Sequence, residues 1–90
     1  MKTIEELKTL LITSFPKEKI YLFGSRAKGN ASMYSDYDIA IESSHSLKKK
    51  LSQIKYLIEK SNIPYKIDLV ELSKAPYLKK TVHNEGILWH

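Results

Sequence analysis

Hydrophobic residues recur at two spacings along this chain of 90 residues, and the spacings predict an alternation of helices and strands. Apolar side chains three or four residues apart mark one face of a helix, whereas alternating apolar and polar residues mark a half-buried strand. The predicted order is helix 3–14, strand 19–23, a short helical turn that opens 25–35, strand 36–42, helix 47–61, strand 65–71, helix 76–84 and edge strand 87–89.

Residues with known preferences for helix ends support these boundaries. Thr3 followed by Glu6 forms a capping box at the start of the first helix, and Pro16 ends that helix. Pro76 suits the first turn of the last helix, because a proline there loses no helical hydrogen bond. Gly86 is a typical residue just after a helix C-terminus. The local signals therefore agree with the hydrophobic spacing.

The alternation of strands and helices predicts an α/β (α+β) fold. We expect a single small domain over residues 1–90, with a mixed sheet of three to four strands flanked by helices. A chain of this length supports one modest core and leaves no residues for a second lobe.

A Gly-Ser pair directly after the first predicted strand is the first candidate for chemistry. Gly24 permits a tight turn and a close approach of another group. Ser25 offers a hydroxyl and a backbone N–H, and the cations of Arg26 and Lys28 follow. Such a turn is a plausible anion cradle, and phosphate is the usual anion. The alternative is an ordinary turn that ends a strand.

Two aspartates with one residue between them begin the second predicted strand. Asp36 and Asp38 point to the same face of that strand, roughly 6.5 to 7 Å apart at about 3.3 Å rise per residue. Neighbouring carboxylates repel each other, and a divalent cation relieves the repulsion. Mg²⁺ prefers such hard oxygen ligands together with water and substrate phosphates. The alternative is a solvated strand end that carries two aspartates by chance.

A third aspartate, Asp68, lies within the third predicted strand, where aspartate is disfavoured. If this strand lies beside Asp36 and Asp38, three acids converge on one or two metal ions. That arrangement suits two-metal phosphoryl transfer, in which one ion activates the attacking oxygen and the other binds the triphosphate. The alternative is an aspartate at a sheet edge that points to water.

The charge and composition indicate which cellular compartment and which kinds of partner to expect. A net charge of +5 indicates an anionic partner such as a nucleotide, a nucleic acid or an acidic protein face. The lysine runs at 48–50 and 79–80 flank helical apolar positions and suit a solvated helix face. Basic and aromatic residues do not interleave, so nucleic acid is not expected as a direct substrate. The chain lacks cysteine, a signal-peptide core and a membrane-length apolar run, so we expect a cytoplasmic protein with no membrane partner.

Several other polar residues are not expected to take part in chemistry. The histidines His45, His83 and His90 lack the spacing of metal ligands. Glu42 and Glu71 lie at strand ends that lead into loops, and we expect both at the surface.

The spaced motif resembles a known superfamily. Gly24-Ser25, ten intervening residues, Asp36-x-Asp38 and then Asp68 in an apolar strand resemble the signature of the DNA polymerase β-like nucleotidyltransferases. The short chain is similar to the minimal nucleotidyltransferases of bacteria and archaea. The resemblance implies that Gly24 and Ser25 contact the triphosphate and that Asp36 and Asp38 are Mg²⁺ ligands. It also implies that Asp68 is the third acid, which helps to deprotonate the acceptor hydroxyl.

Two positions depart from the superfamily pattern. Tyr37 stands where an aliphatic residue is more usual, and Lys28 stands where arginine is common. Neither position is one of the acids, so the predicted catalytic group is unchanged.

The resemblance predicts transfer of AMP from ATP to a hydroxyl, with Mg²⁺ (two ions in the two-metal arrangement) as cofactor. Minimal nucleotidyltransferases are typically encoded beside a HEPN-domain partner, often as the antitoxin of a toxin–antitoxin pair. The implied acceptor is a tyrosine of a HEPN ribonuclease toxin. One alternative is a non-catalytic antitoxin that neutralises its partner by forming a complex. Another is transfer to an antibiotic or sugar alcohol, which the absence of a second lobe disfavours.

Overall fold

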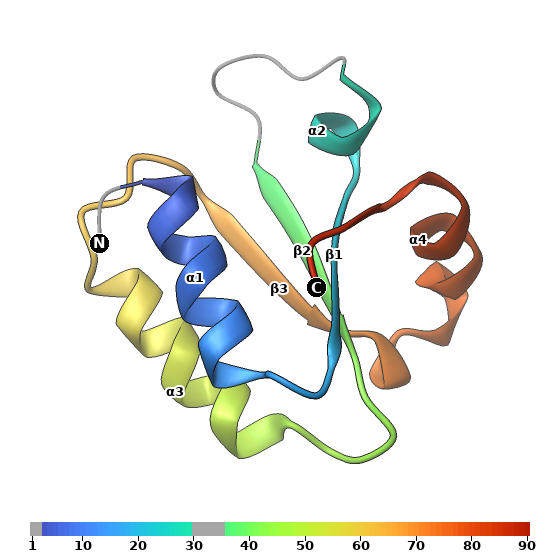
Figure 1. The fold of residues 1–90 in the computed structure, drawn as a ribbon, viewed down its shortest axis with the longest axis horizontal. Helices are drawn as coiled ribbons and strands as arrows, with labels where there is room; N and C mark the ends of the chain where they lie inside the picture. Colours follow the sequence, from blue (N-terminus) through green and yellow to red (C-terminus); the bar gives the residue numbers. More distant parts are fainter. Residues whose placement is uncertain (1–2, 30–35) are drawn as a thin grey trace.

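A four-stranded mixed sheet forms the centre of the protein (Figure 1). The structure is a computed structural model that describes residues 3–29 and 36–90. Within those residues the strand order is β3–β2–β1–β4, where β1 is Lys19–Phe23, β2 is Tyr37–Glu42, β3 is Ile67–Glu71 and β4 is Ile87–Leu88. Strand β1 pairs antiparallel with β2 and β4, whereas β2 and β3 pair parallel. The predicted mixed sheet is therefore confirmed.

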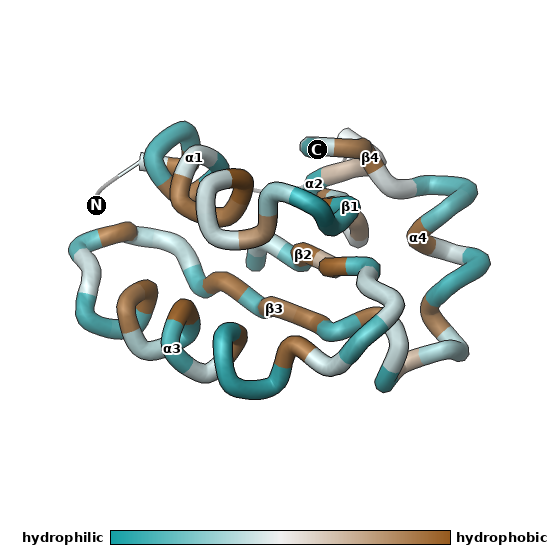
Figure 2. Tube along the Cα trace, turned by 60° about the horizontal axis from the view of Figure 1, so that its bottom comes forward, coloured by the Kyte–Doolittle hydropathy of each residue, from teal (hydrophilic) through white to brown (hydrophobic). Residues whose placement is uncertain are grey.

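Helices cover the two faces of the sheet unequally. Figure 2 shows α1 and α3 on one face and α4 on the other. The helical segments are α1 (Ile4–Ser14), α2 (Ser25–Lys28), α3 (Lys48–Glu59), η1 (Leu72–Lys74), η2 (Pro76–Leu78) and α4 (Lys79–Glu85). None of the helices within the described ranges has the length and apolar character that a membrane crossing requires.

The predicted element boundaries differ from the structure at a few ends. The last helix was expected to start as an α-helix at Pro76, but its first turn is the 3₁₀ segment η2, in which the Leu78 N–H donates to the Ala75 carbonyl at 2.9 Å. Such 3₁₀ turns are common at helix ends. Strands β2 and β3 each begin one or two residues later than expected. Thr3 caps the first helix as expected, because the Glu6 N–H donates to the Thr3 hydroxyl at 3.2 Å.

The main core lies between the sheet and the pair α1 and α3. The alternation in β2 buries Ile39 and Ile41 on this face and sends Asp38 and Ala40 to the other. Burial of large apolar side chains is the main stabilising contribution to such a small domain. The buried members of this cluster are Leu7, Leu11, Phe15, Ile20, Leu22, Ile39, Ile41, Leu47, Leu51, Ile54 and Leu69.

A smaller core on the opposite face holds α4 against the sheet. It consists of buried Phe23, Ala40, Leu72 and Val82, with partly buried neighbours such as Val70. Ala40 and Val70 share their face with Asp38 and Asp68, because side chains two residues apart on a strand point the same way. One part of this face is therefore an apolar contact with α4, and the other part carries carboxylates.

A polar cluster accompanies that small core. The Tyr21 hydroxyl donates to Glu42 at 3.3 Å, and His83 Nε2 on α4 lies 3.1 Å from each carboxylate oxygen of Glu42. Burial raises the pKa of the Tyr21 hydroxyl, and the negative charge of Glu42 adds to that rise. Glu42, which was expected at the surface, is therefore half-buried and connects β2 with α4.

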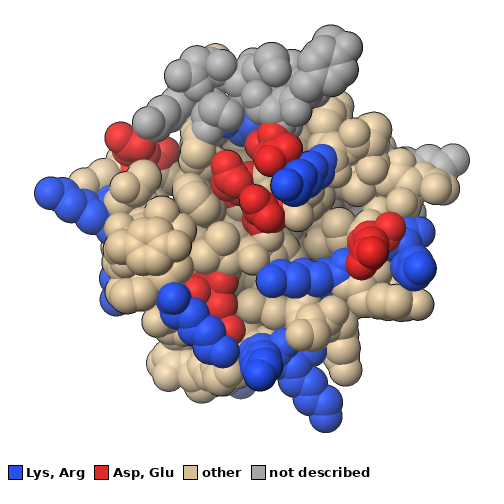
Figure 3. All heavy atoms as spheres, turned by 180° about the vertical axis from the view of Figure 1, so that it is seen from behind, with Lys and Arg blue, Asp and Glu red and all other residues tan. Residues whose placement is uncertain are grey.

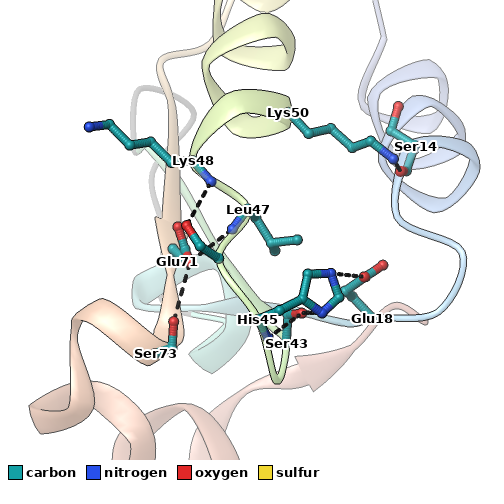
Figure 4. A network of polar contacts seen from close by, with 10 residues as sticks. Ser14, Glu18, Ser43, His45, Leu47, Lys48, Lys50, Glu71 and Ser73 are labelled. Carbon is teal, nitrogen blue, oxygen red and sulfur yellow. Dashed lines mark hydrogen bonds and ion pairs between the residues drawn. The ribbon is translucent and has the colours of Figure 1, made fainter.

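The prediction that Glu71 lies at the surface is wrong. Only 8% of this residue is exposed. Its Oε2 accepts the Leu47 backbone N–H at 3.1 Å and the Ser73 hydroxyl at 3.3 Å (Figure 4). Leu47 precedes α3 and has no side chain that could cap the helix. A carboxylate from a distant strand thus satisfies an N–H at the start of α3, where negative charge is favoured.

Glu71→Ala is expected to lower the free energy of unfolding by about 1 to 3 kcal/mol, because the buried Leu47 N–H loses its acceptor. Urea denaturation of both proteins measures this difference. The control is Glu59→Ala at an exposed position on α3, which we expect to stay within about 0.5 kcal/mol of wild type. Equal stabilities for the Glu71 and Glu59 variants would contradict a capping role for Glu71.

Candidate functional site

Three predicted acids lie at one end of the strands of the sheet. Strand β2 begins there beside the parallel strand β3, and their register pairs Asp38 with Asp68. Asp36 lies two residues before Asp38, immediately ahead of β2. The antiparallel strand β1 finishes at this same end of the sheet, where Phe23 pairs with Asp38 and Gly24 follows. The sheet topology therefore gathers the acids and the Gly-Ser turn at one place.

The acids influence one another electrostatically. Burial raises the pKa of the Asp38 carboxyl, the negative charges of Asp68 and Asp36 raise it further, and the nearby ammonium of Lys66 lowers it. Asp68 is exposed, and Asp36 and Asp38 are half-buried. Figure 3 shows acidic side chains gathered at one place on the molecular surface. Asp38 thus carries its charge at a cost that an added cation would offset.

This donor set fits a hard divalent cation in kind and in charge. Carboxylate oxygens are the protein ligands that Mg²⁺ prefers. Across residues 3–29 and 36–90, however, no three histidine, cysteine, aspartate or glutamate side chains are already placed to hold a metal ion. The register brings the acids onto neighbouring positions, and binding would require their side chains to rotate. The exposure of Asp68 leaves room for that rotation.

Gly24 lets the chain turn directly over Asp38. Its φ of +78° lies in the left-handed region that favours glycine. A Cβ built on Gly24 would overlap Oδ2 of Asp38 and lie 3.3 Å from its Cγ. The turn continues into α2, where the Ala27 N–H donates to the Gly24 carbonyl at 3.1 Å. Only a residue without a side chain fits between this turn and the carboxylate.

The other predicted phosphate contacts stay predictions. The backbones of Ser25 and Lys28 belong to α2. Their side chains lie outside the part of the chain that the structure describes. The backbone of Ser25 directly follows Gly24, so it lies at the same end of the strands as the acids.

Arg26 makes contacts that the sequence did not predict. Its guanidinium lies 4.1 Å from the ring centroid of Tyr37 and 5.0 Å from that of Tyr65. The two rings meet edge to face at 5.2 Å. Tyr37 packs against the core on the α1 and α3 side, opposite to Asp38. Arg26 therefore helps to fix α2 on the sheet through cation–π contacts, in addition to any contact with phosphate.

The sequence contained a sign of the unusual packing at Tyr37, but none of the influence of Lys66 on the acids. Tyr37, which departs from the aliphatic residue that the family resemblance implies at this position, was the sign of a local difference in packing. Lys66, which lies two residues before Asp68 and directly before β3, was not predicted to influence the acids.

Comparison with known proteins shows the family of this chain. The family described as "Polymerase beta, Nucleotidyltransferase" matches residues 5–89. The "Probable protein adenylyltransferase MntA" of Haemophilus influenzae is 36% identical over 66 residues, which cover 72% of this chain and 58% of that protein. A "Putative protein adenylyltransferase" of Methanocaldococcus jannaschii is 31% identical over 98 residues, covering 97% of this chain and 98% of the relative.

A solved structure shares the fold. A chain in the crystal structure of a mutant toxin–antitoxin pair, MntA–HpeT, superposes with a TM-score of 0.73 and 28% sequence identity. The match covers 98% of the present chain and 72% of the other. The chain thus spans somewhat less than two thirds of the Haemophilus relative, and most of this crystallised chain.

Proposed function

The chain belongs to the polymerase β nucleotidyltransferase family, and from this premise we propose that it transfers AMP from ATP to a hydroxyl of a partner protein. The observation that carries the proposal is the parallel register of Asp38 with Asp68 beside the Gly24 turn. Two relatives bear the name protein adenylyltransferase, which favours AMP as the transferred group and a protein as the acceptor.

In this proposal Asp36, Asp38 and Asp68 would hold Mg²⁺, with two ions in the two-metal arrangement. When bound, Mg²⁺ neutralises negative charge on the phosphates and lowers the pKa of the acceptor hydroxyl. The raised pKa of Asp38 supports this assignment, because a cation at the acids would favour the ionised carboxylate.

The residues of the chain position the reactants. Backbone amides of Gly24 and Ser25 hold the triphosphate, and the cation of Lys28 assists. The cation of Arg26 assists after its guanidinium leaves the Tyr37 and Tyr65 rings. The acceptor oxygen attacks the α-phosphorus and forms the new O–P bond, while the bond from the α-phosphorus to the bridging oxygen breaks and pyrophosphate leaves. The hydroxyl proton passes to the carboxylate of Asp68. The protein forms no covalent bond to the substrate in this reaction, because positioning and electrostatic stabilisation dominate phosphoryl-group transfer.

We further propose that the acceptor is a HEPN-domain toxin and that this chain is its antitoxin. The fold match to a chain of a toxin–antitoxin structure supports a toxin partner. Transfer of AMP to a tyrosine hydroxyl of the toxin would then silence it. This assignment gives the reaction a protein acceptor that itself covers the acids.

Mass spectrometry tests the function directly. The purified protein is mixed with ATP, Mg²⁺ and the product of the neighbouring gene, and the intact mass of that product is measured. We expect a gain of one or more AMP units, and none when EDTA is added. ATP labelled at the α-phosphate should label the acceptor, whereas ATP labelled at the γ-phosphate should not. An acceptor of unchanged mass would refute the proposal.

One observation favours a second candidate, a non-catalytic antitoxin that acts by complex formation. In the described ranges the acids are not yet arranged as a set of three metal ligands. If the Asp36→Asn/Asp38→Asn double variant still neutralises the toxin in cells, binding alone is sufficient. If neutralisation is lost while the complex still forms, catalysis is required.

A further inference from the structure

The strand that carries Asp68 lies at an edge of the sheet. Strand β3 pairs with β2 on one side, and within the described ranges no strand pairs with its other side. The backbone N–H and C=O groups of such an edge can pair with an added strand. An acceptor that approaches along this edge comes directly to Asp68.

A groove runs beside this edge, between β3 and α3. It is made of two adjoining hollows that share Lys55 and Leu69. One hollow extends toward Ile58 and Asp68, and the other extends toward Leu51 at the start of the helix. Leucine and isoleucine side chains therefore contribute an apolar lining to both hollows.

Lysines surround the groove. Lys48, Lys55, Lys66 and Lys74 line it, and all four are exposed. The exposed acids that line it are fewer, namely Glu59 and Asp68, because Glu71 is buried under Leu47. The hollow toward Leu51 is thus positive, with three lysines and the single buried acid Glu71, which pairs with Lys74 at 3.9 Å. The hollow beside Asp68 carries two lysines and two acids, and its one exposed acid on β3 belongs to the proposed catalytic group.

We propose that this groove binds an extended acidic segment of the acceptor protein, which pairs with the open edge of β3 and presents its hydroxyl to Asp68. The inference rests on the proposed function. The strand edge supplies main-chain hydrogen bonds, the apolar lining accepts alternate side chains, and the lysines complement carboxylates. A nucleic acid would use the lysines but not the strand edge, and among residues 3–29 and 36–90 Tyr65 is the one aromatic residue that lines the groove.

Binding to simple polymers tests the groove without ATP. The probe is a fluorescent random copolymer of glutamate and tyrosine, with a copolymer of lysine and tyrosine as the reversed-charge probe. The test variant is Lys48→Glu/Lys55→Glu. The matched control is Lys79→Glu/Lys80→Glu, which makes the same change in net charge at exposed positions on α4. Fluorescence anisotropy gives the dissociation constants.

We expect the wild type to bind the glutamate copolymer and not the lysine copolymer. The groove variant should bind about tenfold or more weakly, and the α4 variant should bind within about twofold of wild type, because distant charges are largely screened. Hydrogen exchange in residues 67–71 should slow when the glutamate copolymer binds. Equal losses in both variants, or unchanged exchange in β3, would overturn the inference.

Two more measurements separate this inference from the proposed function. Tighter binding of a polyuridylate oligonucleotide, lost in the groove variant, would identify a nucleic-acid groove and overturn the inference. If the copolymers behave as expected but labelled ATP never modifies the acceptor, the peptide groove stands and the proposed chemistry falls.

Discussion

Asp38→Asn is expected to reduce AMP transfer by about a thousandfold or more, because the proposed reaction would lose a carboxylate that holds Mg²⁺ and with it several kcal/mol of transition-state stabilisation. The same change is expected to raise the melting temperature in metal-free buffer. Burial and the charges of Asp68 and Asp36 raise the pKa of Asp38 in the folded protein. The ionised carboxylate therefore destabilises the fold at neutral pH, and an uncharged amide does not.

The sign of the pH dependence follows from that shift. As the pH falls toward the raised pKa, the folded protein takes up a proton at Asp38 before the unfolded chain does, so stability increases. This local gain should be present in the wild type and absent in Asp38→Asn. Thermal melts across that pH range, with and without Mg²⁺, measure it. Mg²⁺ should raise the melting temperature of the wild type and not that of the variant.

The control for Asp38 is Glu5→Gln, which removes an exposed carboxylate in the first turn of α1. It should retain transfer and the pH-dependent gain. A residual transfer rate in Asp38→Asn above about a tenth of wild type, a barrier change of only 1.4 kcal/mol, would show that this acid is not a required metal ligand.

Gly24→Ala is expected to reduce transfer by about a hundredfold or more and to destabilise the protein by about 1 to 3 kcal/mol, because its backbone conformation is strained for alanine. The added methyl group would also overlap Oδ2 of Asp38, so either the carboxylate or the turn must move. A small displacement at a reacting centre can cost this much rate. Steady-state transfer rates and urea denaturation measure the two effects.

Gly29 offers a matched control for this change. Its φ is +77°, against +78° for Gly24, but a Cβ at Gly29 would meet nothing within 4 Å. Gly29→Ala should therefore show the backbone strain of about 1 kcal/mol without the loss of transfer. If the two alanine variants lose activity equally, the contact between Gly24 and Asp38 has no special importance.

Local signals in the sequence were sufficient for most of the fold. The bounds of β1 agree with the predicted strand, and Thr3 caps the start of α1 by accepting from the Glu6 N–H. These features depend on residues that are close in the chain. The face on which Asp38 lies also follows from the alternation with Ile39 and Ile41.

Features that depend on distant contacts could not be predicted. The sequence alone does not show that β3 pairs with β2 in parallel. This pairing places Asp68 beside Asp38. Glu71 looked like a surface residue because its partner, the Leu47 N–H, is 24 residues away. The stack of Arg26 on Tyr37 and Tyr65 likewise joins three separate segments.

Helix α4 does not cover the part of the sheet face that carries Asp38 and Asp68, and this exposure affects when ATP reacts. A nucleotide held at Asp38 and Asp68 would face bulk solvent, and water is itself a nucleophile that competes with the intended hydroxyl. Within residues 3–29 and 36–90, α4 covers another part of this face, and Asp68 stays exposed. In the proposed reaction we expect the docked acceptor to exclude water from the nucleotide. ATP should therefore be consumed mainly when that molecule has docked.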